Sequence, residues 1–221
     1  MSAIADREQK QICLPRGWVW TEVGEIADVK GGKRLPKRNT YSEVPTKHAY
    51  IRVTNFENMT VNEDDILYIQ NETYNVIKSY TISKDDVYIS IAGTIGKIGL
   101  IPQKLDGANL TENAAKVTNL NFIDKKYLVY MLNSSLCQEQ ITKSTISSNQ
   151  PKLALFRIKQ IALPLPPLAE QQRIVAKIEE LFSQLDAGIE ALKKVRAELK
   201  RYRQAVLKYA FEGKLTEEWR R

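Results

Sequence analysis

The segment from Gly93 to Lys97 contains the residue types of a phosphate-binding loop. A Walker loop requires Gly-x-x-x-x-Gly-Lys-Ser/Thr, so that backbone amides surround the phosphates and a hydroxyl reaches the metal. Here the two glycines stand too close together, and Ile98 occupies the place of the hydroxyl. The sequence therefore argues against a nucleotide-binding site.

Other catalytic and metal-binding patterns are also missing from the sequence. His48 is the only histidine, and Cys13 and Cys137 are the only cysteines. A zinc site needs three or four such ligands at short spacings, and a nucleophile needs a base beside it. There is no Gly-x-Gly-x-x-Gly and no Pro-Pro-aromatic motif of the kind that amino-methyltransferases use. We predict no catalytic residue, no metal ligand and no cofactor, and hence a chain that is not an enzyme by itself.

Basic and amide side chains are the remaining candidates for chemistry. The net charge is +7, and the stretch from Lys30 to Arg52 holds seven basic residues and one acid, Glu43. A second stretch, residues 141–161, contains no acid. Lysine neutralises DNA phosphates, whereas Arg, Asn and Gln form bidentate bonds with base edges. The predicted phosphate contacts are Lys30, Lys33, Lys37, Lys97, Lys143 and Lys152, and the predicted base readers are Arg34, Arg38, Arg52, Asn55, Thr94, Asn109, Asn113, Ser147, Asn149 and Gln150. A solvated basic face, with ordinary loop and capping roles for each residue, is the alternative.

The first 165 residues predict a strand-rich α+β domain that must position these side chains. Alternating or β-branched segments predict strands at Ala49–Phe56, Asp86–Ile91 and Ala114–Val117. Asp124 is expected to cap a helix that runs to about Leu136. The pair Gly31-Gly32 marks a loop that needs either unusual backbone angles or close approach.

Residues 166–221 predict a long helical arm. Apolar residues recur there at alternating steps of four and three, which is the seam of a coiled coil, and the helix would be roughly 60 Å long. The residues assigned to the seam are Ile178, Leu181, Leu185, Gly188, Leu192, Val195, Leu199, Tyr202 and Val206. Gly188 replaces an apolar residue, either for close helix approach or as a weak spot that costs about 1 kcal/mol. We expect the arm to pair with a partner helix.

The composition limits the cellular location. No apolar run approaches the roughly 18 residues that a membrane span requires, and the first 11 residues lack the apolar core of a signal peptide. These observations favour a cytoplasmic protein without a membrane partner.

Several ordered motifs resemble those of the DNA-specificity subunit of type I restriction-modification systems. The resemblance extends over nearly the whole chain. It rests on Leu14-Pro15-x-Gly17-Trp18 with Gly31-Gly32, Tyr50–Asn55, Ile89–Lys97, Leu163–Val175 and Ala210–Arg220. The most specific of these is the proline-rich Leu163–Val175.

The resemblance implies that the first domain reads one half of a bipartite DNA target. The arm would act as a ruler and would dock methyltransferase subunits, through which restriction subunits join. Members of this family usually carry two recognition domains and two helices, whereas this chain has one of each. It is then either a half-subunit that pairs with its own copy or part of a longer reading frame. Two copies about a two-fold axis would form an antiparallel coiled coil and read a palindromic, interrupted target.

Two other classes of function are the alternatives. A stand-alone DNA methyltransferase or nuclease would need a methyl-donor pocket or metal-binding carboxylates. A coiled-coil assembly module would use the first domain to bind protein instead of DNA. The target bases and the oligomeric state do not follow from the sequence.

Overall fold

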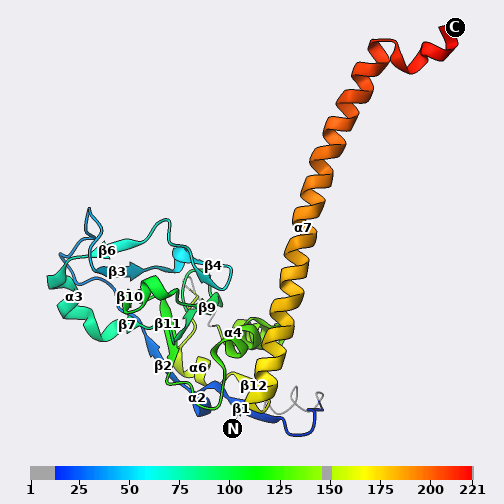
Figure 1. Ribbon diagram of the computed structural model, residues 1–221. Coiled ribbons are helices and arrows are strands. Elements are labelled where there is room, and N and C mark those ends of the chain that lie inside the picture. Colours follow the sequence, from blue (N-terminus) through cyan, green and yellow to red (C-terminus); the bar gives the residue numbers. More distant parts are fainter. Residues whose placement is uncertain (1–12, 146–150, 221) are drawn as a thin grey trace. The chain divides into compact units, whose positions relative to one another are not determined.

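The computed structural model describes residues 13–145 and 151–220 of the 221-residue chain. In these residues the protein is mixed α+β and ends in one long helix, which confirms the predicted fold class (Figure 1). The chain divides into two compact units between Val175 and Ala176.

Among the described residues, the strands of the first unit form two four-stranded sheets and two strand pairs. The first sheet has the order β2 (Asp28–Gly31), β11 (Ala114–Thr118), β8 (Val87–Ser90), β9 (Ile98–Leu100), with antiparallel neighbours. The second has the order β6 (Leu67–Ile69), β3 (His48–Ile51), β10 (Ala108–Leu110), β7 (Thr81–Ile82), in which only β3 and β10 are parallel. The antiparallel pairs are β1 (Val19–Glu22) with β12 (Ala162–Leu165), and β4 (Phe56–Glu57) with β5 (Thr60–Val61).

Short helices connect these strands. The α-helices of the first unit are α2 (Val23–Ile26), α3 (Asn71–Ile77), α4 (Lys125–Asn133), α5 (Ser135–Ser144) and α6 (Leu155–Lys159), and its 3-10 turns are η2 (Val53–Asn55), η3 (Lys78–Tyr80) and η4 (Gln103–Leu105). The long helix α7 covers Leu168–Phe211 and is followed by the 3-10 segment η5 (Lys214–Arg220).

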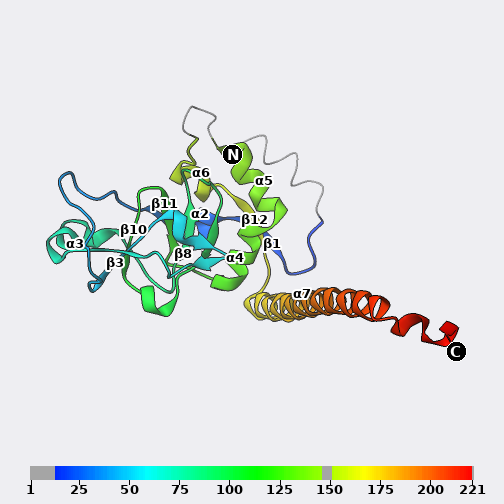
Figure 2. The same cartoon turned by 90° about the horizontal axis from the view of Figure 1, so that it is seen from above.

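Strand β8 lies between two hydrophobic cores, because successive side chains of a strand point to opposite faces. Val87 and Ile89 pack in one core with residues of α2, α4, α5 and α6. Tyr88 points into the other core, where its ring stacks on Phe56 with the centroids 3.7 Å apart. Figure 2 accordingly shows β8 and β11 between α4 and the sheet that contains β3. The first sheet is therefore covered on both faces.

Two predicted elements end earlier than the sequence indicated. The strand expected over Ala49–Phe56 ends at Ile51, because the Asn55 side chain accepts a hydrogen bond from the Arg52 N–H and closes a 3-10 turn. The helix after Asp124 is capped as predicted, with its carboxylate accepting from two backbone amides. It breaks at Ser134, whose amide and hydroxyl both donate to the Met131 carbonyl oxygen. A separate helix, α5, follows.

The first turns of α7 belong to the first compact unit. The Gln171 side chain is fully buried and bonds to the backbone of Phe122, Asp124 and Pro166. Val175 is buried in the same core as α4. The division between the units therefore lies ten residues beyond the boundary at residues 165 and 166 that the prolines suggested.

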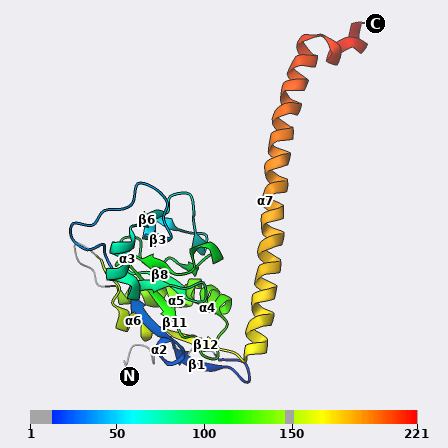
Figure 3. The same cartoon turned by 60° about the vertical axis from the view of Figure 1, so that its left-hand side comes forward.

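The second unit consists of the remainder of α7 and η5. Helix α7 contains 44 residues and no break in its helical assignment, as Figure 3 shows. At 1.5 Å per residue it is roughly 66 Å long. This confirms the predicted long helix.

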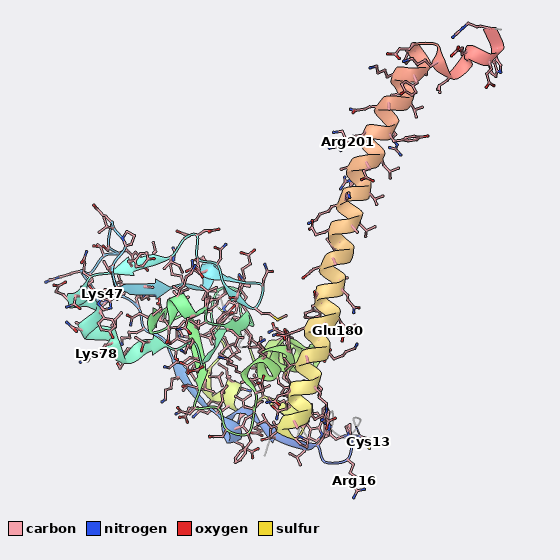
Figure 4. The ribbon with its side chains drawn as sticks, viewed as in Figure 1. Cys13, Arg16, Lys47, Lys78, Glu180 and Arg201 are labelled. Carbon is pink, nitrogen blue, oxygen red and sulfur yellow. The ribbon has the colours of Figure 1, made fainter. Side chains whose placement is uncertain are left out.

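The two cysteines occupy opposite environments, which yields a first prediction. Cys13 is exposed (Figure 4), whereas burial raises the pKa of the Cys137 thiol to about 12. At pH 8 only about one Cys137 in ten thousand would be a thiolate, the form that reacts with alkylating reagents. We expect iodoacetamide to label one cysteine per native chain and two in denaturant, as counted by intact mass. Labelling of both cysteines at equal rates in the native protein would contradict the buried position of Cys137.

Candidate nucleic-acid interface

An open pocket of about 330 Å³ lies at one edge of the second sheet of the first unit. It contains three of the predicted DNA-binding residues, Arg34, Arg52 and Asn113. Its other lining residues are Leu35, Tyr41, Tyr50, Val53, Thr54, Thr111 and Glu112. The fold has thus brought together side chains from three segments that are far apart in the sequence.

The parallel pairing of β3 and β10 explains this convergence. Leu110 at the end of β10 lies opposite Ile51 at the end of β3. Parallel strands end at the same edge of a sheet, so the residues that follow them meet there. Arg52 to Thr54 follow β3, and Thr111 to Asn113 follow β10. The third segment is the loop after β2, which begins with Gly32.

Gly32 lets this loop approach the end of β10. A Cβ atom placed on Gly32 would lie 2.1 Å from the carbonyl oxygen of Thr111 and 2.4 Å from that of Leu110. The next residue, Lys33, donates its amide to the Leu110 carbonyl oxygen at 2.8 Å, and the Tyr50 hydroxyl donates to the Lys33 carbonyl oxygen at 2.8 Å. Of the two alternatives for the glycine pair, close approach is the one found at Gly32.

Replacing Gly32 with alanine is therefore expected to destabilise the first unit. The added methyl group overlaps the carbonyl oxygens of Leu110 and Thr111, which cannot move freely because they accept the amides of Lys33 and Ala114, at a cost of about 1–3 kcal/mol. Thermal or urea unfolding measures this change. The matched control is Gly107→Ala, because a Cβ there meets nothing within 4 Å, although its φ of +79° adds backbone strain. An alanine at position 32 that is no more destabilising than one at position 107 would contradict the close approach.

Arg34 and Glu112 form an ion pair at the pocket. The Arg34 Nε donates to a Glu112 carboxylate oxygen at 2.6 Å. This hydrogen bond and the carboxylate charge raise the pKa of Arg34. Partial burial alone would raise the pKa of Glu112, but the hydrogen bonds from Arg34 and Thr111 outweigh it and lower this pKa. Both groups are therefore charged at neutral pH.

Two predicted base readers are buried and hold the fold together instead. Asn55 is 2% exposed, and its amide bridges the Arg52 amide and the Asp65 carbonyl oxygen. Asn109 is 1% exposed and donates to the Ile77 carbonyl oxygen at 2.9 Å. Neither side chain is placed to reach a base edge in this structure, which counts against both as base readers. Amides serve buried turns as well as DNA, and the sequence does not distinguish the two roles.

Two predicted cations are also engaged in internal contacts. The Arg52 guanidinium donates to the carboxylate of Asp65 at 2.6 Å and to its carbonyl oxygen at 3.0 Å. The Lys97 ammonium donates to the Phe56 carbonyl oxygen at 2.7 Å. Arg52 nevertheless lines the pocket, whereas Lys97 does not line it and its ammonium is bonded to the backbone.

The other cations of the basic stretch lie on the surface. Lys33, Lys37 and Arg38 are exposed in the loop after β2, and Lys30 lies at 3.9 Å from Asp28 on β2. Lys47 and Lys78 lie at the same end of this unit, near β3 and α3 (Figure 4). Lys33, Lys37 and Arg38 thus share the loop of the pocket residue Arg34, whereas Lys47 precedes β3 and lies at the end of that strand away from the pocket.

A described residue of the acid-free stretch lies beside the segment Gly93–Lys97. Lys152 forms a β-bridge with Ala92, two residues before the exposed Thr94. Lys143 is exposed at the end of α5. The predicted base readers Ser147, Asn149 and Gln150 lie outside the described residues. Thr94 and Lys152 therefore form a second group, separate in sequence from the pocket residues.

Glu112 and Tyr41 line the pocket although neither belongs to the predicted DNA-binding residues. Those residues are cations, amides and hydroxyls, and an acid is an unexpected component of a DNA-binding surface. The one available signal was the position of Glu112 between Thr111 and Asn113, in a polar segment between two strands.

His48 makes structural contacts with two neighbouring side chains. Its ring stacks on Tyr74 with centroids 3.9 Å apart, and its Nε2 lies 3.1 Å from the Asn71 side-chain oxygen. Across residues 13–145 and 151–220, no group of three His, Cys, Asp or Glu side chains is placed to hold a metal ion. The same part of the chain contains no helix long and apolar enough to span a membrane.

Comparison with known families identifies the chain. The sequence model of the type I restriction modification DNA specificity domain matches residues 15–201, which include the pocket and most of α7. The chain belongs to this family.

Relatives of this specificity domain come from bacteria and archaea. The present chain is 25% identical over 211 residues to the type I restriction enzyme EcoBI specificity subunit of Escherichia coli. This match covers 95% of the present chain and 44% of that protein. The EcoKI specificity subunit of Escherichia coli K12 is 27% identical over 212 residues, at 94% and 45% coverage. The MjaVIII specificity subunit of Methanocaldococcus jannaschii is 21% identical over 208 residues, at 91% and 47% coverage. The chain thus spans about half the length of these relatives.

Solved structures show the same fold. The HsdS subunit from Thermoanaerobacter tengcongensis matches with a TM-score of 0.62 and 24% identity, covering 92% of this chain and 47% of that one. A chain from a study of complex assembly and conformational transition of the type I R-M system matches with a TM-score of 0.72 and 24% identity, at 96% and 50% coverage.

The predicted seam of the specificity domain's helix is open to solvent in the single chain. Its four leucines, Val195 and Tyr202 are exposed, with Leu192 at 70% and Leu199 at 53%, whereas Ile178 and Val206 are half-buried. A Cβ on Gly188 would meet no atom within 4 Å, so nothing inside one chain requires glycine there.

Proposed function

We propose that this chain is a DNA-specificity subunit of a type I restriction-modification system and reads one half of a bipartite target. Support comes from the family match and above all from one observation. Exposed Lys33, Lys37 and Arg38 border a pocket that presents Arg34 and Asn113 at one edge of a rigid sheet. Phosphate-neutralising lysines beside fixed polar groups are the arrangement by which proteins bind duplex DNA and read its bases.

The arm supports the second part of the proposal. Its apolar seam is exposed along the helix, and solvent exposure of such a seam is unfavourable. We expect it to pair antiparallel with a second copy, which would give a palindromic target with a fixed gap. Methyltransferase subunits would dock on the paired helices, and restriction subunits would join through them. In this scheme the chain works in the cytoplasm, carries no active site and binds no cofactor.

Salt dependence of DNA binding tests the first part. The variant Lys33→Ala/Lys37→Ala is expected to bind every duplex more weakly by a similar factor. Each phosphate contact contributes about 0.9 to the slope of log K against log salt, so the slope should fall by up to about 2. Fluorescence anisotropy with labelled duplexes between 50 and 200 mM salt measures both quantities.

The control is Lys194→Ala/Lys200→Ala, which removes the same charge from exposed positions of α7. It should leave the slope unchanged. A chain that binds no duplex even at low salt would contradict the DNA-reading proposal and favour a protein-assembly role. A changed base preference without a changed slope would remove the two lysines from the phosphate contacts.

A further inference from the structure

The Arg34 guanidinium is held on one side and open on the other. Its Nε is bonded to Glu112, yet its side chain is 78% exposed. In the described part of the chain, the structure gives its terminal nitrogens no hydrogen-bond partner. Arg52, on the same pocket, differs because its terminal Nη2 is already bonded to Asp65. Of the two pocket arginines, Arg34 is therefore the one whose terminal N–H groups form no hydrogen bond in the described residues.

Glu112 is itself fixed. One carboxylate oxygen accepts from Arg34, and the other accepts from the Thr111 hydroxyl at 3.0 Å. The residue follows β10 directly after Thr111, whose amide donates to the Ile51 carbonyl oxygen at 3.0 Å. The carboxylate is therefore anchored to the sheet edge rather than to a free loop.

The backbone beside Arg34 is fixed as well. Lys33, its neighbour, bonds through its amide to Leu110 and through its carbonyl oxygen to the Tyr50 hydroxyl. Arg34 thus has a fixed starting point in the backbone and a fixed Nε at the far end of its side chain. A side chain held in this way loses little conformational entropy when its terminal nitrogens bind a ligand.

The chemistry of the pair favours a base over a phosphate. A phosphate is attracted by net positive charge, and Glu112 cancels the charge of Arg34 and repels an anion in the same pocket. A guanine edge is uncharged and presents two acceptors, O6 and N7, which match two parallel N–H donors of a guanidinium. The exposed Lys33, Lys37 and Arg38 are better placed for phosphates, because no carboxylate is bonded to them in the described residues.

We propose that Arg34 reads a guanine in the major groove through its terminal nitrogens, and that Glu112 is the positioning residue that orients it. This inference rests on the proposed DNA-reading function. It adds the identity of one recognised base, guanine, and a positioning role for Glu112. One position of the half-target is then a G·C pair.

The test is selection of duplexes from a randomised library by the purified full chain, followed by sequencing. Wild type should select guanine at one position. Arg34→Lys keeps the charge but removes the two parallel N–H donors of the guanidinium. It should reduce the guanine preference at that position by about tenfold or more and leave the slope of log K against log salt unchanged. Glu112→Gln should reduce the preference at the same position, while overall binding stays equal or increases because a negative charge is lost.

Arg16→Lys is the matched control, since Arg16 is exposed on the first unit but belongs neither to the pocket nor to the predicted DNA-binding residues; it should leave the guanine preference intact. A wild-type chain that selects no sequence would overturn the proposed function itself. Wild-type selection that survives Arg34→Lys unchanged, or an Arg34→Lys variant that weakens all duplexes equally, would overturn this inference alone. A Glu112→Gln variant with wild-type preference would remove Glu112 from the positioning role.

Discussion

Replacing both Leu192 and Leu199 with glutamate is expected to convert a dimer of this chain into a monomer. Both positions lie on the exposed apolar seam of α7. A dimer would bury four of these leucines, each worth about 1.5–3 kcal/mol, so their loss should raise the dissociation constant by at least about 10⁴-fold. Glutamate adds the cost of placing charge in an apolar interface. Sedimentation equilibrium against the chain mass of 25.3 kDa measures the result.

The control for this experiment carries the same added charge on the opposite face of α7. Ala197 and Gln204 lie outside the heptad seam, and Ala197→Glu/Gln204→Glu should remain dimeric. A seam variant that stays dimeric would show that the arm is not the pairing surface. A wild-type chain that is monomeric at high concentration would contradict self-pairing and direct attention to a different partner helix.

Replacing Asp86 with alanine is expected to cause a large loss of stability in the first unit. The Asp86 side chain is 6% exposed and lies 3.4 Å from the Lys116 ammonium, which is itself only 17% exposed. Asp86 also accepts the Ser83 amide at 2.8 Å. Removing it leaves the largely buried Lys116 ammonium without its negative partner and with only the Thr81 carbonyl oxygen as an acceptor, which costs up to about 3–5 kcal/mol. Urea unfolding with a fluorescence readout measures the difference.

The neighbouring residue supplies the control. Asp85 pairs with Lys125 at 3.2 Å, but its side chain is 72% exposed, so Asp85→Ala should cost no more than about 1 kcal/mol. Adding Lys116→Met to Asp86→Ala should restore part of the lost stability, because no buried charge then remains unpaired. Equal effects of Asp85→Ala and Asp86→Ala would show that burial does not strengthen this ion pair.

Some of the candidate site could be predicted from local sequence alone. The cluster of basic residues between Lys30 and Arg52 could be recognised from the amino-acid composition of that stretch, and its lysines are exposed in the structure. The sequence left two explanations for the pair Gly31-Gly32, unusual backbone angles or close approach, and the structure shows close approach at Gly32. The burial of Asn55 and Asn109 could not be predicted, because burial depends on which strands pair across the sheet, and pairing partners such as β3 and β10 are separated by more than fifty residues.

The family, the α+β class and the long helix could be predicted from the amino-acid sequence, because motifs, heptad spacing and helix caps involve residues that are close together along the chain. The make-up of the site depends instead on how distant segments pack. Arg34 meets Glu112 because a glycine lets its loop pack against the end of β10, and the parallel pairing of β3 with β10 places Arg52 and Asn113 at the same edge. Such contacts join residues distant along the chain, and no local pattern records them.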